Sequence, residues 1–477
     1  MKKNVLFAVA ILIMHTASAQ WLPQNAGFTN DTLGFYEMSL PDKNTAWAVC
    51  YDGKLGLLSG RPVLDFTRTT NGGETWIPGK MGTDRTLRFS NISAINGQEA
   101  WVAMNKIAPV PNNLFLSFAK GGGIFHTTDA GLTWEHTDSG QLFNNNSIPR
   151  FVHFKDKNHG VAMGDPNGGY FEVYITNNKG KKWKRVQVSK LPAPLTNEIG
   201  WISGYAVVGN TIWFGTSMGR MYKSVDFGEN WTVHIVDPLP GTYVNEIAFL
   251  DDGLTGVAHL RGRSRTFVFS TTDGGLTWTN YFQPANWKNS RMTAVPGTRA
   301  FVSTAVHPNP MFQGSAVSYD AGQTWTEIEK DASKAVCRFF DAHTGYAGGF
   351  FQTTPFQGGI FKSQIDFQIN GDHDNNTQAQ NSGGVQDLVS EKRDVADLVK
   401  VYPTPARDII NISLEGQLAG TTSVIRIISL DGKVVETRRV KASGLVQIDI
   451  HKLAPGMYVL RVESANQTVS KTITVSR

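Results

Sequence analysis

One phrase recurs six times along this chain, and its spacing constrains the fold more than any other feature. It reads "STTDGGLTW" at residues 270–278, and it returns with small changes, ending each time in tryptophan. These tryptophans are separated by 58, 49, 48, 47 and 47 residues, at Trp76, Trp134, Trp183, Trp231, Trp278 and Trp325. A period of this length is typical of β-propellers, in which each repeat forms one four-stranded blade.

The residues of the phrase predict a turn and not an active site. Asp273 can accept hydrogen bonds from its own turn, Gly275 allows an unusual backbone conformation, and Trp278 can wedge between blades. Thr271 and Thr277 can pair across the hairpin. The acidic position is filled by Asn71, Asp129, Asn178, Asp226, Asp273 and Asp320. Because asparagine keeps such a turn but has no acid–base chemistry, we interpret the phrase as a structural joint.

A second column of residues predicts an all-β, seven-bladed propeller. Each repeat contains a short strand with an aromatic residue or valine, at Trp47, Trp101, Val161, Trp213, Val257, Phe301 and Tyr346. The column therefore has one member more than the phrase. The last repeat ends at "GGIFKS" (358–363), which resembles third strands of earlier repeats, and its outer strand is missing.

The start of the chain can supply that strand. The segment "QWLPQNAG" (20–27) resembles "TWIPGKMG" (75–82), where an outer strand begins. We therefore expect Trp21 to begin the outer strand of the last blade, so that the N-terminal segment closes the ring and hides its edges. Six or eight blades are the alternatives.

The two ends of the chain predict export. Residues 1–19 have a charged start, a short apolar run and an Ala-Ser-Ala site, which is the layout of a signal peptide. No later segment is long and apolar enough to span a bilayer. We expect the propeller over residues 20–366, a flexible polar linker over 367–398, and a small β-sandwich of alternating strands over 399–477.

The repeated phrase resembles the Asp-box, or BNR repeat, of sialidases, sortilin-type receptors and xyloglucan hydrolases. Residues 20–366 resemble bacterial BNR-repeat proteins similar to photosystem-II stability and assembly factors. The fragments that carry this resemblance are "HGVAMGDPNGGYFEVYITNNKGKKW" (159–183) and "TIWFGTSMGRMYKSVDFGENW" (211–231). It implies a propeller fold and leaves the activity open, because fold does not imply function.

The C-terminal region resembles the sorting domain of type IX secretion substrates of Bacteroidetes. The matching motifs are Tyr402-Pro403-x-Pro405-Ala406, Asp431-Gly432-Lys433, Leu453-x-x-Gly456-Met457-Tyr458 and Lys471. Thr404 stands where that family usually has asparagine. The resemblance implies that the type IX machinery is a partner, that the domain is usually cleaved at the outer membrane, and that the protein is secreted or held at the cell surface.

The charge distribution excludes a nucleic-acid footprint on the propeller. The chain carries a net charge of +5, and residues 399–477 alone contain 11 Lys and Arg against 6 Asp and Glu. The predicted propeller is therefore close to neutral, whereas nucleic-acid binding needs a basic patch on the binding domain itself.

Ligands of propellers gather at the mouth of the central channel, and we expect them on the loops opposite the Asp-box hairpins. Arg88, Arg150 and Arg338 each precede a phenylalanine at the start of an inner strand, so they could clamp a carboxylate as in sialidases. Alternatively, these arginines satisfy channel carbonyls or pair with Glu198 and Glu246. The full candidate set is Arg88, Arg150, Asp165, Glu198, Glu246, Arg291 and Arg338.

Other signals of chemistry are weak. Asp165, in "GDPNGG" (164–169), either orients a ligand or completes a turn. The Arg-Ile-Pro motif of sialidases is absent, and neither its Tyr/Glu pair nor the paired carboxylates of a glycosidase can be assigned. No His/Cys cluster has metal spacing, and "DHDNN" lacks the glycine and distal glutamate of a calcium loop. We expect neither metal nor cofactor.

We therefore expect a monomeric, secreted or surface propeller that binds a protein or glycan through its loop face. The alternative is a glycoside hydrolase, sialidase-like or endo-glucanase-like, with a site in the central channel. An assembly factor for another exported complex is a third possibility. Cys50 and Cys337 fall on adjoining blades, where a disulfide is geometrically possible and two buried free thiols are the expectation.

Overall fold

The computed structural model describes two units of the chain, Met1–Asp374 and Asn375–Arg477. The described residues are 20–365, 367 and 399–475, apart from residues 31, 53–62, 85, 110–115, 138–141, 144–146, 240, 263–265, 282, 308, 351–357, 403–405, 415–421, 430–432, 442–444 and 464–467. The predicted signal peptide and nearly all of the predicted linker lie outside the described residues. Each unit is considered by itself.

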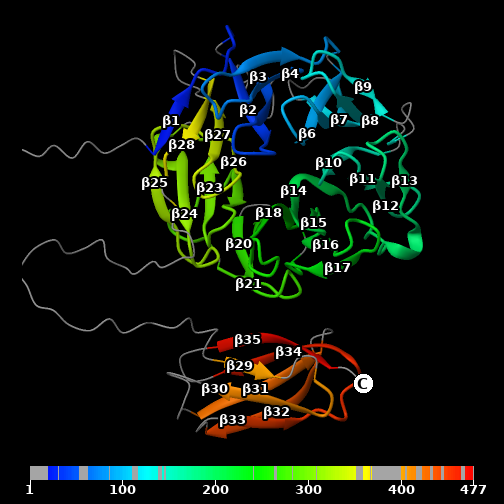
Figure 1. Ribbon diagram of the computed structural model, residues 1–477, viewed down its shortest axis with the longest axis vertical. Coiled ribbons are helices and arrows are strands. Elements are labelled where there is room, and N and C mark those ends of the chain that lie inside the picture. The colour runs from blue at the N-terminus through cyan, green and yellow to red at the C-terminus, as the bar shows by residue number, and fades with distance from the viewer. Residues whose placement is uncertain are drawn as a thin grey trace, which may run out of the picture. The chain divides into compact units, whose positions relative to one another are not determined.

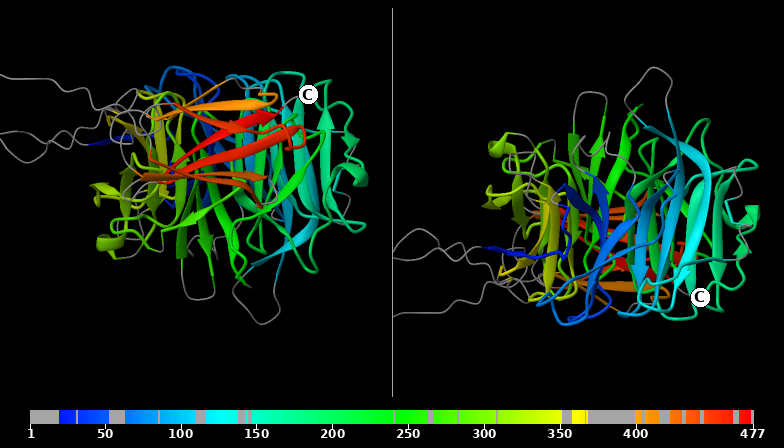
Figure 2. Two further views of the ribbon diagram at one scale, coloured as in Figure 1. Left: turned by 90° about the horizontal axis from the view of Figure 1, so that it is seen from below. Right: turned by 90° about the horizontal axis from the view of Figure 1, so that it is seen from above.

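The described residues between Trp21 and Ser363 form seven four-stranded antiparallel sheets, here called blades, around a common axis (Figure 1). This confirms the all-β propeller, and the number of sheets is the one predicted from the second-strand column. In the first six blades, four consecutive strands pair in chain order. In Figure 2, where this unit is seen from the side, its strands run roughly along the ring axis.

Blade one contains β2 (Leu33–Ser39), β3 (Ala46–Asp52), β4 (Asp65–Thr69) and β5 (Ile77–Lys80). Blade two contains β6 (Leu87–Ala94), β7 (Ala100–Pro109), β8 (Leu116–Thr127) and β9 (Glu135–His136). Blade three contains β10 (Pro149–Phe154), β11 (Gly160–Pro166), β12 (Phe171–Thr176) and β13 (Lys184–Arg185). Blade four contains β14 (Gly200–Val208), β15 (Thr211–Thr216), β16 (Arg220–Ser224) and β17 (Thr232–Ile235). Blade five contains β18 (Tyr243–Phe249), β19 (Gly256–Arg261), β20 (Thr266–Thr271) and β21 (Thr279–Asn280). Blade six contains β22 (Arg291–Ala294), β23 (Phe301–Ala305), β24 (Gly314–Ser318) and β25 (Thr326–Glu329). Short 3-10 helices are η3 (Val188–Lys190) and η4 (Pro310–Phe312).

The seventh blade combines both ends of the propeller sequence. It contains β26 (Val336–Phe339), β27 (Gly345–Phe350), β28 (Gly358–Ser363) and, as its outer strand, β1 (Trp21–Gln24). Trp21 pairs with Ser363 in the β1–β28 ladder. Its indole is buried and donates from Nε1 to Ser315 Oγ of blade six at 2.9 Å. The N-terminal strand therefore joins blade seven and also contacts blade six.

The Asp-box is a hydrogen-bonded turn between the third and fourth strands. Asp273 Oδ1 accepts from the Thr271 hydroxyl at 2.7 Å and from the Thr277 N–H at 3.0 Å, and Oδ2 accepts from the Thr277 hydroxyl at 2.5 Å. The two threonines therefore meet through the carboxylate and not directly. Gly275 has a φ of 88°, and a Cβ there would lie 2.2 Å from Met221 of the preceding blade. The turn is the predicted joint.

The box turn of blade five also docks on its neighbours. Within blade five, the Gly274 N–H donates to Leu254 O, in the turn between the first and second strands, at 2.8 Å. Trp213 and Lys223 of blade four both donate to Gly274 O, at 3.0 and 2.9 Å. The seven column residues of the second strands are 0–1% exposed: Trp47, Trp101, Val161, Trp213, Val257, Phe301 and Tyr346. Apolar contact across blade interfaces holds the ring together.

Cys50 and Cys337 are both buried free thiols. Burial raises the pKa of each thiol above its usual value. This agrees with the expectation of two inert thiols and gives the seam between blades one and seven no covalent lock. Apolar packing holds that seam, with Phe35 and Met38 of blade one against Val336 and Ile360 of blade seven. The β1–β28 ladder completes blade seven itself.

The second unit is a small sandwich of two antiparallel sheets. One contains β29 (Val399–Tyr402), β30 (Ile409–Leu414) and β33 (Leu445–Asp449), and the other contains β31 (Thr422–Ser429), β32 (Val434–Lys441), β34 (Gly456–Glu463) and β35 (Thr468–Val475). Alternate residues of both sheets share one core, among them Ile410, Ile412, Ile425, Ile427, Leu460 and Val462. The alternating pattern that predicted this sandwich reflects one buried and one solvated face.

The joint can be tested at Asp273. Asp273→Ala removes the acceptor of the turn, and we expect it to lower the free energy of unfolding by about 1–3 kcal/mol. Asp273→Asn keeps Oδ1 as an acceptor, as Asn71 does for the Thr75 N–H at 3.0 Å in blade one, and should cost less than half as much. Urea unfolding measures both. Equal losses for the two variants would contradict the account of the turn.

The contribution of the closing strand β1 to stability can be tested at Trp21. Trp21→Ala should destabilise the propeller by about 3–5 kcal/mol, the usual cost of truncating a buried aromatic residue. Leu22 is the matched control, because its side chain is 47% exposed on the same strand. Leu22→Ala should change the free energy of unfolding by less than about 0.5 kcal/mol. Similar thermal shifts for both variants would show that β1 does not secure the ring.

Candidate functional site

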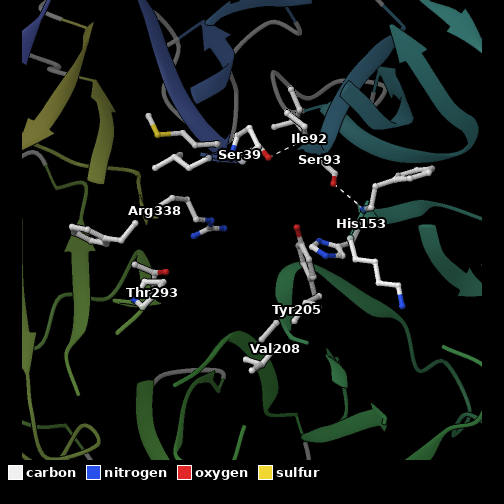
Figure 3. Close-up of a pocket in the computed structure, with 18 of the residues that line it drawn as sticks. Ser39, Ile92, Ser93, His153, Tyr205, Val208, Thr293 and Arg338 are labelled. Atoms are coloured by element: carbon white, nitrogen blue, oxygen red, sulfur yellow. Dashed lines mark hydrogen bonds between the residues drawn. The ribbon is translucent and has the colours of Figure 1, made fainter. Parts of the chain in front are cut away.

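A cavity of about 870 Å³ lies on the axis of the propeller. Every blade contributes to its wall through the first strand, with Ser39 (β2), Ser93 (β6), His153 (β10), Tyr205 (β14), Glu246 (β18), Thr293 (β22) and Arg338 (β26). Several of these side chains are drawn in Figure 3, where the Arg338 guanidinium and the Tyr205 hydroxyl point toward the centre. A site on this axis can therefore draw on all seven blades at once.

The cavity lies at the Asp-box end of the channel, and not at the opposite end where ligand loops were expected. Its rim contains Asn96, Asp156 and Asp251, which belong to turns between first and second strands. The box turns dock on these same turns. Toward the other end, β-bulges precede residues such as Glu37 and Glu246 on the first strands. A bulge re-aims side chains, which here places polar groups across the axis.

These polar groups form what we call the axial polar cluster: Glu37, Asn91, Tyr205, Glu246, Arg291 and Arg338. Arg338 Nη2 donates to Glu37 Oε1 at 2.7 Å, and Arg291 Nη1 donates to Glu246 Oε2 at 3.1 Å. Both carboxylates are almost fully buried, at 1% and 2% exposure. Each ion pair crosses from one blade to another, so the cluster also ties the blades together.

Asn91 orders the remaining part of the cluster. Its Oδ1 accepts from the Val152 N–H at 2.9 Å, and its Nδ2 donates to Val152 O at 2.9 Å. These two bonds to backbone fix the orientation of the amide. The same Nδ2 also donates to the Tyr205 hydroxyl at 3.0 Å, so the phenol oxygen is held as an acceptor.

Burial dominates the electrostatics of the cluster. It raises the pKa of Glu246 to about 8, although Arg291 and Arg338 act in the opposite direction. Burial also raises the pKa of Tyr205 to about 12, and it lowers the pKa of His153 to about 4. For Arg338, burial acts to lower the pKa, but Glu37 and Glu246 outweigh it and keep the pKa above its usual value. At neutral pH both Tyr205 and His153 are uncharged.

The predicted clamp of three arginines does not form. Arg150 makes a bidentate pair with Asp165, at 2.8 and 2.6 Å, and is 4% exposed. The Arg88 guanidinium lies 5.5 Å from the centre of the Tyr36 ring. Arg338 pairs with Tyr346 of the second-strand column, whereas His153 takes that place opposite Val161 in blade three, so Arg150 lies three residues before the place of Arg338. Of the three, only Arg338 lines the axial cavity.

The other predicted residues are also divided between the axial polar cluster and the scaffold. Glu246 pairs with Arg291, as the structural alternative predicted, but Glu198 pairs with Arg220. Asp165 also accepts from the Gly200 N–H at 3.0 Å, which links blades three and four. Asp165 therefore serves the scaffold in this structure. Glu246, Arg291 and Arg338 are the predicted residues that the fold brings together.

Sequence reasoning missed Glu37, Asn91 and Tyr205. A weak signal existed for two of them, because Glu37 and Asn91 each stand ten residues before the buried tryptophan of the next strand, Trp47 and Trp101. Arg291 stands ten residues before Phe301 in the same way. Tyr205 breaks this spacing, since the β14–β15 register is irregular between Gly200 and Tyr205. Within the described ranges, no group of three or more His, Cys, Asp or Glu side chains could hold a metal ion.

A family model and a curated relative each match part of this chain. Residues 400–476 match the family described as the secretion system C-terminal sorting domain. The chain is 29% identical over 153 residues to the photosystem II stability/assembly factor HCF136, chloroplastic, of Oryza sativa subsp. japonica. That match covers 30% of this chain and 31% of the relative's length. The C-terminal region is thus a sorting domain, and the propeller is similar to an assembly factor over part of its length.

Two of the solved structures to which this chain is similar carry different descriptions. A structure described as YCF48 bound to D1 peptide has 16% identity, covers 73% of this chain and 97% of that one, and has a TM-score of 0.48. The GH74 enzyme of Niastella koreensis has 11% identity, covers 96% and 69%, and has a TM-score of 0.44. Among the described residues, no helix is long and apolar enough to cross a membrane.

The scaffold role of Asp165 can be tested by unfolding. Asp165→Ala leaves Arg150 buried without its partner, and we expect a loss of about 3–5 kcal/mol in the free energy of unfolding. The double variant Arg150→Met, Asp165→Leu replaces the pair by apolar groups and should recover most of that loss. Circular dichroism during chemical denaturation compares the three proteins. A single variant as stable as the parent chain would remove Asp165 from the scaffold.

Proposed function

We propose that this chain is an exported binding protein whose propeller holds a protein or glycan ligand in the axial cavity and does not transform it. The matched sorting domain supports secretion, and we assign the type IX route and a secreted or surface location to the mature protein. The predicted leader at residues 1–19 fits the first step of that route. The propeller is then the part delivered outside the cell.

The observation that carries the binding function is the cavity itself, together with the state of its carboxylates. A pocket of about 870 Å³ falls in the size range of ligand sites. Glu37 and Glu246 lie beside it, but each is buried and paired with an arginine. A glycosidase uses two carboxyl groups that flank the bond to be cleaved. Carboxyl groups held by hydrogen bonds from guanidinium groups favour a binding role over hydrolysis.

One observation favours the alternative, a glycoside hydrolase. Glu246 lines the cavity, and its pKa is raised to about 8. A buried carboxyl group with a raised pKa is the feature expected of a general acid. Tyr205 lines the same wall. Glycoside hydrolysis at Glu246 is therefore the second candidate function.

The experiment that tests binding is a screen of the purified chain on glycan and peptide arrays that include sialylated and plant polysaccharides. Val208 lines the cavity, whereas Leu132 is 84% exposed on an Asp-box turn. Val208→Trp fills the cavity without changing the polar cluster, and we expect it to weaken a specific hit by about tenfold or more. Leu132→Trp is the matched control and should leave binding unchanged.

Two results would count against this function. Hits that survive Val208→Trp at full affinity would place the ligand elsewhere on the molecule. Release of product from a bound glycan, abolished in Glu246→Gln, would establish the hydrolase in place of the binding protein. Arrays without a specific hit would remove the glycans and peptides tested as ligands.

A further inference from the structure

We infer that the axial cavity binds its ligand through a carboxylate group, which accepts hydrogen bonds from the Arg338 guanidinium and the Tyr205 hydroxyl. This inference deepens the proposed function and rests on it, because it names the chemical group by which a ligand of that cavity is held. The two donors lie on β26 and β14, on different blades, and both side chains point into the cavity (Figure 3).

The first argument concerns the proton of Tyr205. The Asn91 amide is oriented by Val152, so the group that faces the phenol is Nδ2, a donor. The phenol oxygen accepts that bond and cannot donate back along it. No donated hydrogen bond is recorded for the Tyr205 hydroxyl among the described residues. Since the side chain lines the cavity, its proton is available to an acceptor that enters there.

The second argument concerns Arg338. Its Nη1 donates to Cys337 O at 3.0 Å and its Nη2 donates to Glu37 Oε1 at 2.7 Å. A guanidinium group has five N–H donors, so these two bonds leave further N–H groups for a ligand. The side chain is 22% exposed, whereas that of Glu37 is 1% exposed. The Arg338 guanidinium therefore faces the cavity, whereas the Glu37 carboxylate does not.

The third argument concerns charge. The cluster contains two glutamates and two arginines. Tyr205, which also belongs to it, and His153 beside it are uncharged at neutral pH. Burial raises the pKa of Glu246 to about 8, with Glu37 acting in the same direction and Arg291 and Arg338 against it. Below pH 8 Glu246 is mainly protonated, which leaves the cluster with one excess positive charge. A single carboxylate neutralises that excess, and a guanidinium and a hydroxyl match its two oxygens.

The carboxylate can come from two sources, the end of a protein chain or an acidic sugar. The test uses the full chain and two matched pairs of small probes in ligand-observed NMR titrations. N-acetylglycine is compared with N-acetylglycinamide, and D-glucuronate is compared with D-glucose. We expect a carboxylate probe to bind with a Kd on the order of millimolar, and at least about tenfold more tightly than its neutral partner. The pair that shows the larger ratio identifies the source.

Variants locate the contact. Tyr205→Phe keeps the ring and removes the donor, and it should weaken the carboxylate probe about fivefold or more. Tyr174→Phe is the matched control, because its hydroxyl donates to Glu172 Oε1 at 3.2 Å on β12, outside the cavity lining. Arg338→Met should abolish binding, but it also leaves Glu37 without its partner. The Tyr205 variant therefore decides the question if the Arg338 variant fails to fold.

The pH dependence gives an independent readout. A group whose pKa is raised to about 8 is protonated below that pH, so the excess positive charge is present at pH 6.5 and is lost by pH 9.5. We expect the affinity for the carboxylate probe to fall across this range, while that of the neutral probe stays constant. Glu246→Gln should remove the dependence.

Several outcomes would overturn the inference. They are equal affinities within each probe pair, no binding of any probe, or an unchanged affinity in Tyr205→Phe. A specific array hit that is lost in Val208→Trp but insensitive to Tyr205→Phe would keep the proposed function and reject the carboxylate contact. Carboxylate-specific probe binding without a specific array hit would keep the carboxylate contact and reject the glycans and peptides on the arrays as ligands.

Discussion

A four-stranded sheet with two apolar faces is stable in water only when another sheet covers each face, and the whole propeller follows from that constraint. Blades that pack in a row leave two faces uncovered, whereas blades in a ring leave none. The column from Trp47 to Tyr346 is buried at these interfaces, and the box turns add hydrogen bonds between neighbours. With Cys50 and Cys337 as free thiols, the interface between blades one and seven depends on apolar packing, and the β1–β28 ladder completes blade seven.

The same ring creates the site. Seven first strands meet at the axis, and bulges turn some of their polar side chains inward. A carboxyl group buried there is costly unless it is hydrogen-bonded, and Arg338 and Arg291 donate to Glu37 and Glu246. These pairs connect different blades. The cluster is therefore part of the scaffold and also the wall of the cavity, and a ligand that enters finds donors already held in place, which reduces the cost of ordering them on binding.

The fold could be predicted from the sequence because its signals repeat. Six copies of a turn at a near-constant period and seven buried residues on the second strands reinforce one another. The likeness between residues 20–27 and 75–82 indicated the closing strand. The sandwich was visible as alternation. These features depend on local turn chemistry and on burial, both of which leave a periodic trace.

The site could be predicted only in part, because strand register and bulges leave no such trace. Arg88, Arg150 and Arg338 look equivalent in sequence, yet the register place of Arg338 is taken in blade three by His153 and not by Arg150. The irregular register before Tyr205 hid that residue. Glu246 was named from its place in the repeat, but its partnership with Arg291 was one alternative among several. Which end of the channel holds the cavity depended on how these side chains fill the axis.

The most direct test of binding in the axial cavity is hydrogen–deuterium exchange of the full chain with and without a ligand selected on the arrays. The account predicts slower exchange in the ends of the first strands and the turns that follow them, at residues 153–157 and 205–209, which line the cavity. Protection confined to the loops at the opposite end of the propeller, with those segments unchanged, would contradict it.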